Sequence, residues 1–293
     1  MKKENQSKIM LICAMLIFGT IGLFRKYIPL PSGMLAMARG FIGMFFLIFI
    51  IIIKREKLSF EQIKKNFVLL FLSGAFIGFN WILLFEAYRY TSVAVATLCY
   101  YMAPMFVVCA SPFIFGERLN STKIICILAA FVGMIMISGV LNEGSINSNE
   151  IKGVLFGLGA ALLYATVIMM NKKIGDIKAY DKTIVQLGTA GLVILPYTLL
   201  AEGGEIVFTP FIIFMIVVVG ILHTGVAYAL YFGAVGRLKA QTTAIFSYID
   251  PVVAVILSTL ILGEKIGIIG YIGAILILGA AFLIERPQKS DAK

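Results

Sequence analysis

The sequence predicts an all-α integral membrane protein with ten transmembrane helices, arranged as two inverted five-helix repeats. Three observations lead to this prediction: the composition, the succession of apolar segments and an internal similarity. Of the 293 residues, 60% are hydrophobic and 14% are charged, and the mean hydropathy is +0.99. A soluble domain averages about 45–50% apolar and about 25% charged residues, so the composition excludes an ordinary soluble protein. It equally excludes a disordered chain, which would be rich in charge.

Apolar segments long enough to cross a bilayer recur along almost the whole chain. A crossing helix needs roughly 20 residues. The first segment follows a basic N-terminus, but no small-residue cleavage site follows it, so we interpret it as a retained helix rather than a signal peptide. The expected spans are 8–26, 32–53, 66–88, 92–114, 121–140, 151–171, 182–201, 210–233, 238–262 and 266–284.

Lysine and arginine are distributed unevenly between the loops. If the N-terminus is cytoplasmic, 19 of the 25 Lys and Arg residues fall on the cytoplasmic side, five on the opposite side and Arg39 inside a span. Basic residues favour cytoplasmic loops. We therefore expect a multi-pass protein of the cytoplasmic membrane whose tails, 1–7 and 285–293, are cytoplasmic. The same asymmetry accounts for the net charge of +10, so the lipid bilayer is an expected partner and nucleic acid is not.

A shift of 147 residues aligns the first half of the chain with the second. It places Pro104 on Pro251, Trp81 on Tyr228, Tyr101 on Tyr248 and the Gly-Glu pair at 116–117 on the pair at 263–264. We therefore divide the chain into repeats over 8–140 and 151–284. Because five is an odd number, the second repeat must cross the membrane in the opposite direction. Inverted repeats around a site at the midplane are typical of secondary transporters.

These features resemble the drug/metabolite transporter superfamily, specifically its EamA type with two five-helix repeats. The matching residues are Phe18, Gly19, Lys26, Arg39, Pro104, Gly116, Glu117, Arg118, Leu119 and Gly133 in the first half, and Tyr164, Ala165, Asn171, Lys172, Lys173, Pro251, Gly263, Glu264, Lys265 and Gly273 in the second. Three positions depart from the family pattern: Phe18 replaces a tryptophan, and Cys126 and Ala280 replace glycines. The resemblance covers residues 8–284 and implies transport of a small organic solute.

Asp250 lies close to the centre of the ninth expected span, directly before Pro251. Charged groups in hydrocarbon are costly, so such a residue suggests a function. Proline has no N–H and frees the carbonyl of Ser247, and Pro104 does the same for the other repeat, so both prolines are candidate helix hinges. The Asp250 carboxylate either binds a cationic ligand group or a proton, or only fixes helix packing, protonated or paired with Arg39.

Two further polar residues lie inside spans. His223 is near the centre of the eighth span, and the ordinary histidine pKa of about 6.5 would suit proton coupling. The alternative is a neutral histidine that bonds across helices. Arg39 either binds a carboxylate or phosphate of the substrate or neutralises Asp250.

Aromatic and amide side chains suggest the lining of a cavity. At helical spacing, one face of the third span carries Asn80, Trp81, Leu84 and Tyr88, and one face of the fourth carries Thr97, Tyr101 and Pro104. One face of the eighth carries Thr224, Tyr228 and Tyr231, with His223 at its edge. Such groups can stack on a planar ligand or hold an ammonium group. The alternative for each residue taken singly is core packing.

Other candidate residues have structural interpretations. Glu117 and Glu264 each precede the last helix of a repeat, where a carboxylate can accept unpaired amide hydrogens. Glu86 and Arg89 are spaced for a local ion pair. The four cysteines lie in apolar runs without metal-ligand spacing, so neither a metal nor another cofactor is expected.

The sequence therefore favours a secondary active transporter of a small organic metabolite, such as an amino acid, an amine or a related compound. We expect alternating access by rocking of the two halves, export rather than import, proton coupling through Asp250 or His223, and a monomer. No Walker A motif is present, so ATP drive would need another subunit. No H-E-x-x-H or G-x-S-x-G motif is present either, so we do not expect an enzyme. The remaining alternatives are a channel or membrane sensor and, less favoured, an intramembrane enzyme.

Overall fold

The computed structural model describes residues 2–116, 119–137, 148–174, 177–202, 208–235, 237–238 and 246–285. Every regular element within these ranges is a helix, which confirms the all-helical prediction for them. The helices are α1 (Lys2–Gly19), α2 (Ile21–Tyr27), α3 (Ser32–Ile53), α4 (Phe60–Lys65), α5 (Phe67–Tyr90), α6 (Val93–Tyr100), α7 (Ala103–Phe115), α8 (Ser121–Ile137), α9 (Ser148–Lys173), α10 (Ala179–Ala201), α11 (Pro210–Val218), the π-helix η1 (Val219–Val226), α12 (Ala227–Val235), α14 (Ile249–Leu260) and α15 (Ile268–Glu285).

Within the described residues, seven helical stretches are long and apolar enough to cross a membrane. They are Glu4–Tyr27, Ser32–Ile53, Phe67–Tyr90, Val93–Phe115, Ser148–Lys173, Ala179–Leu200 and Pro210–Ala234. Three shorter apolar helices, Ser121–Ile137, Ile249–Leu260 and Ile268–Leu283, lie at the expected fifth, ninth and tenth spans. The count of ten spans stays a prediction, because residues 138–140 and 239–245 of the fifth and ninth spans lie outside the described residues.

Several of the long stretches are interrupted. The first is divided at Thr20, between α1 and α2, and the fourth is divided at Tyr101 and Met102, just before α7, whose second residue is Pro104. The break before Pro104 agrees with the prediction, since proline cannot donate to the preceding turn and is tolerated in the first turn of a new helix. Pro251 likewise lies in the first turn of α14.

The π-helix η1 interrupts the eighth span and was not predicted. Its residues Gly220 and Gly225 face α3 so closely that a Cβ atom at either would lie 2.5 Å from a side-chain atom of Ile42 and 2.4 Å from one of Phe46, respectively. A wider helical turn and close packing on α3 therefore occur together. Single π-helical turns are often found at functional sites.

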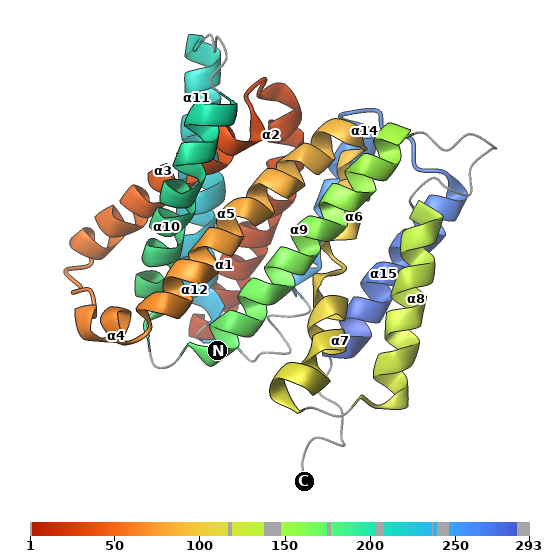
Figure 1. Ribbon diagram of the computed structural model, residues 1–293, viewed down its shortest axis with the longest axis horizontal. Helices are drawn as coiled ribbons and strands as arrows, with labels where there is room; N and C mark the ends of the chain where they lie inside the picture. The colour runs from red at the N-terminus through yellow and green to blue at the C-terminus, as the bar shows by residue number, and fades with distance from the viewer. Residues whose placement is uncertain are drawn as a thin grey trace.

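The helices run back and forth between two ends of one bundle (Figure 1). At the lower end of the view lie the start of α1 and the short helix α4; at the upper end lie α2 and the start of α11. Contacts join the loops at the lower end: Asp181 accepts a hydrogen bond from the Ser59 amide at 2.9 Å, and Lys178 lies 3.8 Å from the Glu56 carboxylate. The lysine-rich loops between α3 and α5 and between α9 and α10 are therefore at the same end.

The most extensive helix contacts join one half of the chain to the other. They are α5 with α9, α8 with α15, α3 with α10, α5 with α10, α1 with α12 and α3 with η1. The shift of 147 residues makes α1 equivalent to α9, α3 to α10, α5 to the η1–α12 stretch, and α8 to α15. By this equivalence the α5–α9 contact corresponds to α1–α12, and α5–α10 corresponds to α3–η1. The contacts α3–α10 and α8–α15 each join a helix to its own equivalent. The halves are thus interleaved through their most extensive contacts, and the expected rocking of the two halves stays a prediction.

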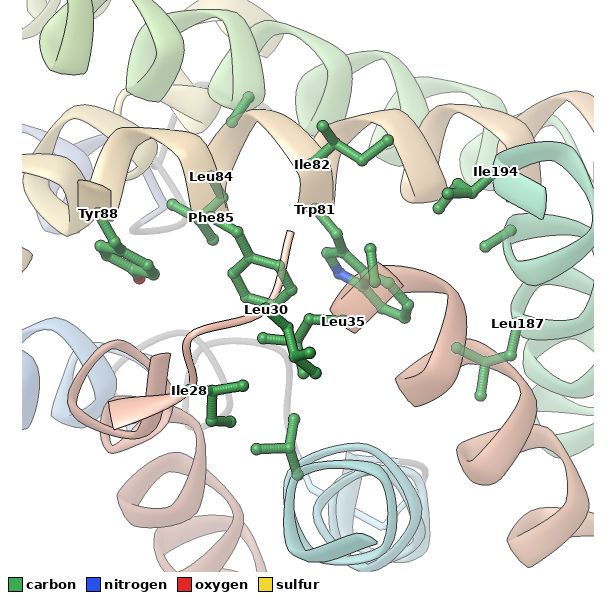
Figure 2. Close-up of a cluster of buried hydrophobic side chains, with 14 of the residues drawn as sticks. Ile28, Leu30, Leu35, Trp81, Ile82, Leu84, Phe85, Tyr88, Leu187 and Ile194 are labelled. Carbon is green, nitrogen blue, oxygen red and sulfur yellow. The ribbon is translucent and has the colours of Figure 1, made fainter. Parts of the chain in front are cut away.

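The largest buried cluster lies where α3, α5 and α10 meet. Leu35, Phe85, Leu187 and Ile194 are almost fully buried there, and the Trp81 side chain lies among them (Figure 2). The chain between α2 and α3 closes this cluster with Ile28 and Leu30 (Figure 2). The apolar packing fixes the position of Trp81 and of the neighbouring face of α3, which carries Arg39.

Candidate functional site

Asp250 is the second residue of α14 and is half-buried. Its Oδ2 accepts a hydrogen bond of 2.9 Å from the Tyr101 hydroxyl, which lies in the break between α6 and α7. The same hydroxyl lies 3.4 Å from the carbonyl oxygen of Ser247, the group that Pro251 leaves without its helical partner. The breaks of the fourth and ninth spans therefore meet, and the carboxylate lies at the point where they meet.

Arg39 projects from α3 and is 6% exposed. Its Nε donates a hydrogen bond of 3.0 Å to Thr224 Oγ1 on η1, and its guanidinium carbon lies 4.0 Å from the centre of the Trp81 ring. It is in no ion pair with Asp250 within the described part of the chain, so the interpretation that Arg39 neutralises Asp250 is wrong. The two side chains have different neighbours, because Tyr101 bonds the carboxylate and Thr224 bonds the guanidinium.

A group of tyrosines lies near both charges. Tyr88 and Tyr100 are each within electrostatic range of both Arg39 and Asp250. The Tyr88 hydroxyl lies 3.2 Å from Thr97 Oγ1, and Tyr100 stacks on Tyr164 of α9 with ring centres 5.2 Å apart. Two of these side chains were not predicted as lining residues: Tyr100 and Tyr164. The position of Tyr100 beside the Pro104 break is a signal that could have identified it.

The predicted aromatic residues of the eighth span face α1. Tyr228 contacts Phe18 edge-on at 5.4 Å between ring centres, and Tyr231 contacts it at 6.5 Å. Tyr228 also stacks on Phe232 at 5.7 Å and lies within electrostatic range of Arg39. Phe18, which replaces the tryptophan of the family pattern, thus joins α1 to this aromatic group.

Asn80 is 1% exposed, and its side chain is bonded between helices. Its Nδ2 donates to the carbonyl oxygen of Ala160 on α9 at 2.5 Å, and its Oδ1 accepts from the Tyr100 hydroxyl at 3.5 Å. Asn80 therefore positions Tyr100 and joins α5 to α9.

His223 is fully buried within η1. Its Nε2 lies 2.8 Å from the hydroxyl of Thr20, at the break between α1 and α2, and its ring contacts Phe24 at 4.7 Å between centres. The imidazole thus bonds across helices at a point where both helices depart from regular α-helical geometry.

Glu264 contacts residues distant in the sequence. Its Oε2 accepts hydrogen bonds from the amide of Val93, at 2.8 Å, and from the hydroxyl of Ser258, while its Oε1 lies 3.5 Å from Lys26 Nζ. The amide belongs to the start of α6, so the expectation that Glu264 serves the helix following it is corrected. Glu117, its equivalent, lies outside the described residues.

Further polar contacts join the helices at this end of the bundle. Arg25 donates to Ser32 at 3.1 Å, and Ser32 donates to Glu86 at 2.5 Å; the predicted Glu86–Arg89 ion pair is present at 2.9 Å. Glu202 at the end of α10 accepts from the amides of Gly33 and Met34, at 3.0 and 2.9 Å. We call these contacts, together with the Glu264–Val93–Lys26 group, the polar closure. It joins α2, α3, α5, α6 and α10.

The opposite end of the bundle is hollowed. A cavity of about 330 Å³ is bounded by α1, α3, α10 and α12, and is lined by Met10, Phe46, Ile50, Lys54, Tyr180, Val226, Ala229, Leu230, Gly233 and Arg237. Among the described residues, no three side chains of the His, Cys, Asp or Glu type are grouped as a metal site. The four cysteines are all free thiols.

Comparison with known proteins identifies the family. The EamA-like transporter family matches residues 7–139 and again residues 151–286. An uncharacterized transporter of Bacillus subtilis, YxxF, is 29% identical over 99% of this chain and 93% of its own length. A probable amino-acid metabolite efflux pump of Salmonella typhimurium is 27% identical over 75% of this chain and 77% of its own length.

The fold is also similar to that of a solved crystal structure, with 18% identity, a TM-score of 0.66 and coverage of 96% of each chain. The two family matches together cover most of the chain, and its apolar helices are those of a multi-pass membrane protein. The chain therefore belongs to the EamA-like transporter family.

Proposed function

We propose that this protein is a secondary active transporter that moves a small organic metabolite across the cytoplasmic membrane by alternating access. One observation carries the proposal: two opposite charges, Arg39 and Asp250, lie inside the bundle among tyrosines without pairing with each other. Intramembrane charges usually face a substrate or ion pathway. A substrate that binds between the two halves of the chain would contact both Arg39 and Asp250.

In this proposal the substrate binds between two groups of helices. One group consists of α5, α6, α7 and α9, and carries Trp81, Tyr100 and Tyr101. The other consists of α1, η1, α12 and α14, and carries Tyr228, Tyr231 and Asp250. Arg39 approaches from α3. Asp250 or His223 exchanges the coupling proton, and Pro104 and Pro251 act as the hinges.

The two groups, each with helices from both halves, are the moving bodies in this mechanism. The polar closure seals one end of the bundle, and in this proposal the substrate enters or leaves through the cavity at the other end. With the N- and C-termini in the cytoplasm, the sealed end faces outward. The relative named as an amino-acid metabolite efflux pump favours an amino acid or a related compound as the substrate, and export as the direction.

Counterflow in proteoliposomes tests the transporter function. Vesicles containing the purified protein are loaded with an unlabelled amino acid or amine, and uptake of the labelled compound is followed over time. A transporter gives uptake that saturates with concentration and transiently exceeds equilibrium. Uptake that rises linearly without counterflow would favour a channel, and no flux for any compound of the panel would favour a sensor.

A further inference from the structure

Arg39 is a buried positive charge for which the described residues provide no acidic partner. Its side chain is surrounded by Trp81, Phe85 and Thr224, which are 5%, 0% and 0% exposed. Only Nε has a hydrogen-bond acceptor among the described residues, and that acceptor is a neutral hydroxyl. The stacking on Trp81 stabilises the cation but supplies no negative charge.

The two terminal nitrogens of Arg39 make no hydrogen bond within the described part of the chain. The guanidinium is therefore held by its Nε and by one ring face, while its two terminal nitrogens have no hydrogen-bond partner among the described residues. A buried cation without a partner lowers stability unless a further group compensates it.

We infer that the transported metabolite carries a carboxylate that binds the terminal nitrogens of Arg39. This inference rests on the proposed transport function and narrows the substrate class. A guanidinium presents two parallel N–H groups that match the two oxygens of a carboxylate. The single negative charge neutralises the single positive charge, and the adjoining apolar part of the metabolite packs against the aromatic side chains around Arg39.

A carboxylate fits this position better than a phosphate. A doubly charged phosphate would leave a net negative charge inside the bundle unless a second cation approached it. His223, the basic side chain nearest in sequence to Thr224, already contacts Thr20. Lys26 and Arg25 belong to the polar closure, where Glu264 and Ser32 contact them.

Trp81 makes this inference directly measurable. It is the only tryptophan of the chain, so the intrinsic fluorescence of the purified protein reports the ring on which Arg39 stacks. We would titrate the protein with amino acids and simple monocarboxylic acids, each beside its own carboxamide, which has nearly the same size and no negative charge. At least one acid should change the emission saturably, and its carboxamide should bind about ten-fold more weakly or worse.

Substitutions assign the response to Arg39. Arg39→Gln should abolish the response to the acid, and Arg39→Lys should retain part of it, since lysine keeps the charge but lacks the two-pronged geometry. Arg55→Gln, in the exposed loop after α3, is the matched control and should behave as the wild type. Arg39→Met should raise the melting temperature of the ligand-free protein, because it removes a buried charge that has no partner.

The possible outcomes separate this inference from the proposed function. Equal responses to acids and carboxamides, or no Arg39-dependent response to any acid, would overturn the carboxylate assignment. A lower melting temperature of Arg39→Met would also count against it, since that result makes Arg39 a structural residue. Saturable counterflow of amines or sugars in that case would leave the transporter function standing with another substrate class.

Discussion

Asp250 and Arg39 carry opposite charges within one bundle, and neutral groups hold each of them in place. Tyr101 donates to the carboxylate, and Thr224 accepts from the guanidinium. A direct ion pair would fix α14 to α3, whereas separate hydroxyl contacts leave both charges available to a ligand or a proton. The difference between a structural and a functional charge is therefore decided by the neighbours, which come from other parts of the chain.

At this scale, Asp250→Asn tests proton coupling. The amide retains the size and the hydrogen bond from Tyr101 but cannot exchange a proton. Uptake driven by a pH gradient in proteoliposomes should fall to background, while exchange of labelled for unlabelled substrate at equal pH should persist, since exchange requires no net proton movement. Glu61→Gln, on the exposed helix α4, is the control. Gradient-driven uptake at the wild-type rate in Asp250→Asn would exclude Asp250 as the coupling group.

The sequence was sufficient to identify Asp250 and Arg39 as charged residues within apolar spans, because such a residue is recognisable without any structure. Their partners could not be predicted. Tyr101 and Asp250 are 149 positions apart, and Arg39 and Thr224 are 185 apart. Only the three-dimensional arrangement decides whether Arg39 faces a carboxylate or a hydroxyl.

Among the elements, α8 and α15 pack together at the right of Figure 1, through glycines. A Cβ atom at Gly273 would lie 2.5 Å from the carbonyl oxygen of Gly133, and one at Gly133 would lie 2.6 Å from that of Gly273. The two backbones therefore touch, as small residues permit in membrane helices. Each helix is the last of its repeat, so the contact joins equivalent positions of the two halves.

A pair of alanine substitutions in α15 tests this contact. Gly273→Ala should lower the melting temperature in detergent, since overpacking typically destabilises by about 1–3 kcal/mol. Gly279→Ala should leave it unchanged or raise it, because nothing lies within 4 Å of a Cβ there and alanine favours a helix by up to about 1 kcal/mol. Equal melting temperatures for the two variants would contradict the close packing of α8 on α15.

The helices could be predicted from their apolar length, whereas their interruptions could be predicted only in part. Pro104 marks the α6–α7 break because proline lacks an N–H group. No proline accompanies the break at Thr20 or the π-helix η1, which are linked through the contact between Thr20 and His223. Such departures from α-helical geometry depend on packing against other helices and leave no local signal.

For the whole molecule, the polar closure joins five helices at one end through contacts that include the carboxylates of Glu86, Glu202 and Glu264. The carboxylates of Glu202 and Glu264 accept from backbone amides at helix starts, where the orphan N–H groups and the helix dipole favour negative charge. Opening this end requires these bonds to break together. In the proposed transport cycle, the closure would therefore oppose opening at this end.

Glu264→Ala tests the closure by hydrogen–deuterium exchange. Loss of the capping carboxylate is worth about 1 kcal/mol, so exchange should increase about five-fold in peptides covering the start of α6. Peptides of α2 should also exchange faster, through Lys26. Glu56→Ala removes an exposed ion-pairing carboxylate at the opposite end and serves as the control. Unchanged exchange at α6 in Glu264→Ala would show that the closure does not depend on this residue.

The orientation of the bundle is tested by reporter fusions in cells. Green fluorescent protein placed after Lys293 should fluoresce, because the C-terminus is expected in the cytoplasm. Alkaline phosphatase, which is active only outside the cytoplasm, should be inactive there and active when fused after Ile28 or Thr91. The opposite activities would reverse the orientation and place the polar closure at the cytoplasmic face.

The interleaving of the two halves has a consequence for biosynthesis. The ribosome completes α1, α3, α5 and α8 before α12, α10, α9 and α15, their principal partners, exist. Until then, Gly74 and Gly78 of α5, which later touch α10, face lipid or another chain. Helices in a bilayer have no hydrophobic force that drives them together. The newly inserted first half therefore lacks its principal packing partners until the second half arrives.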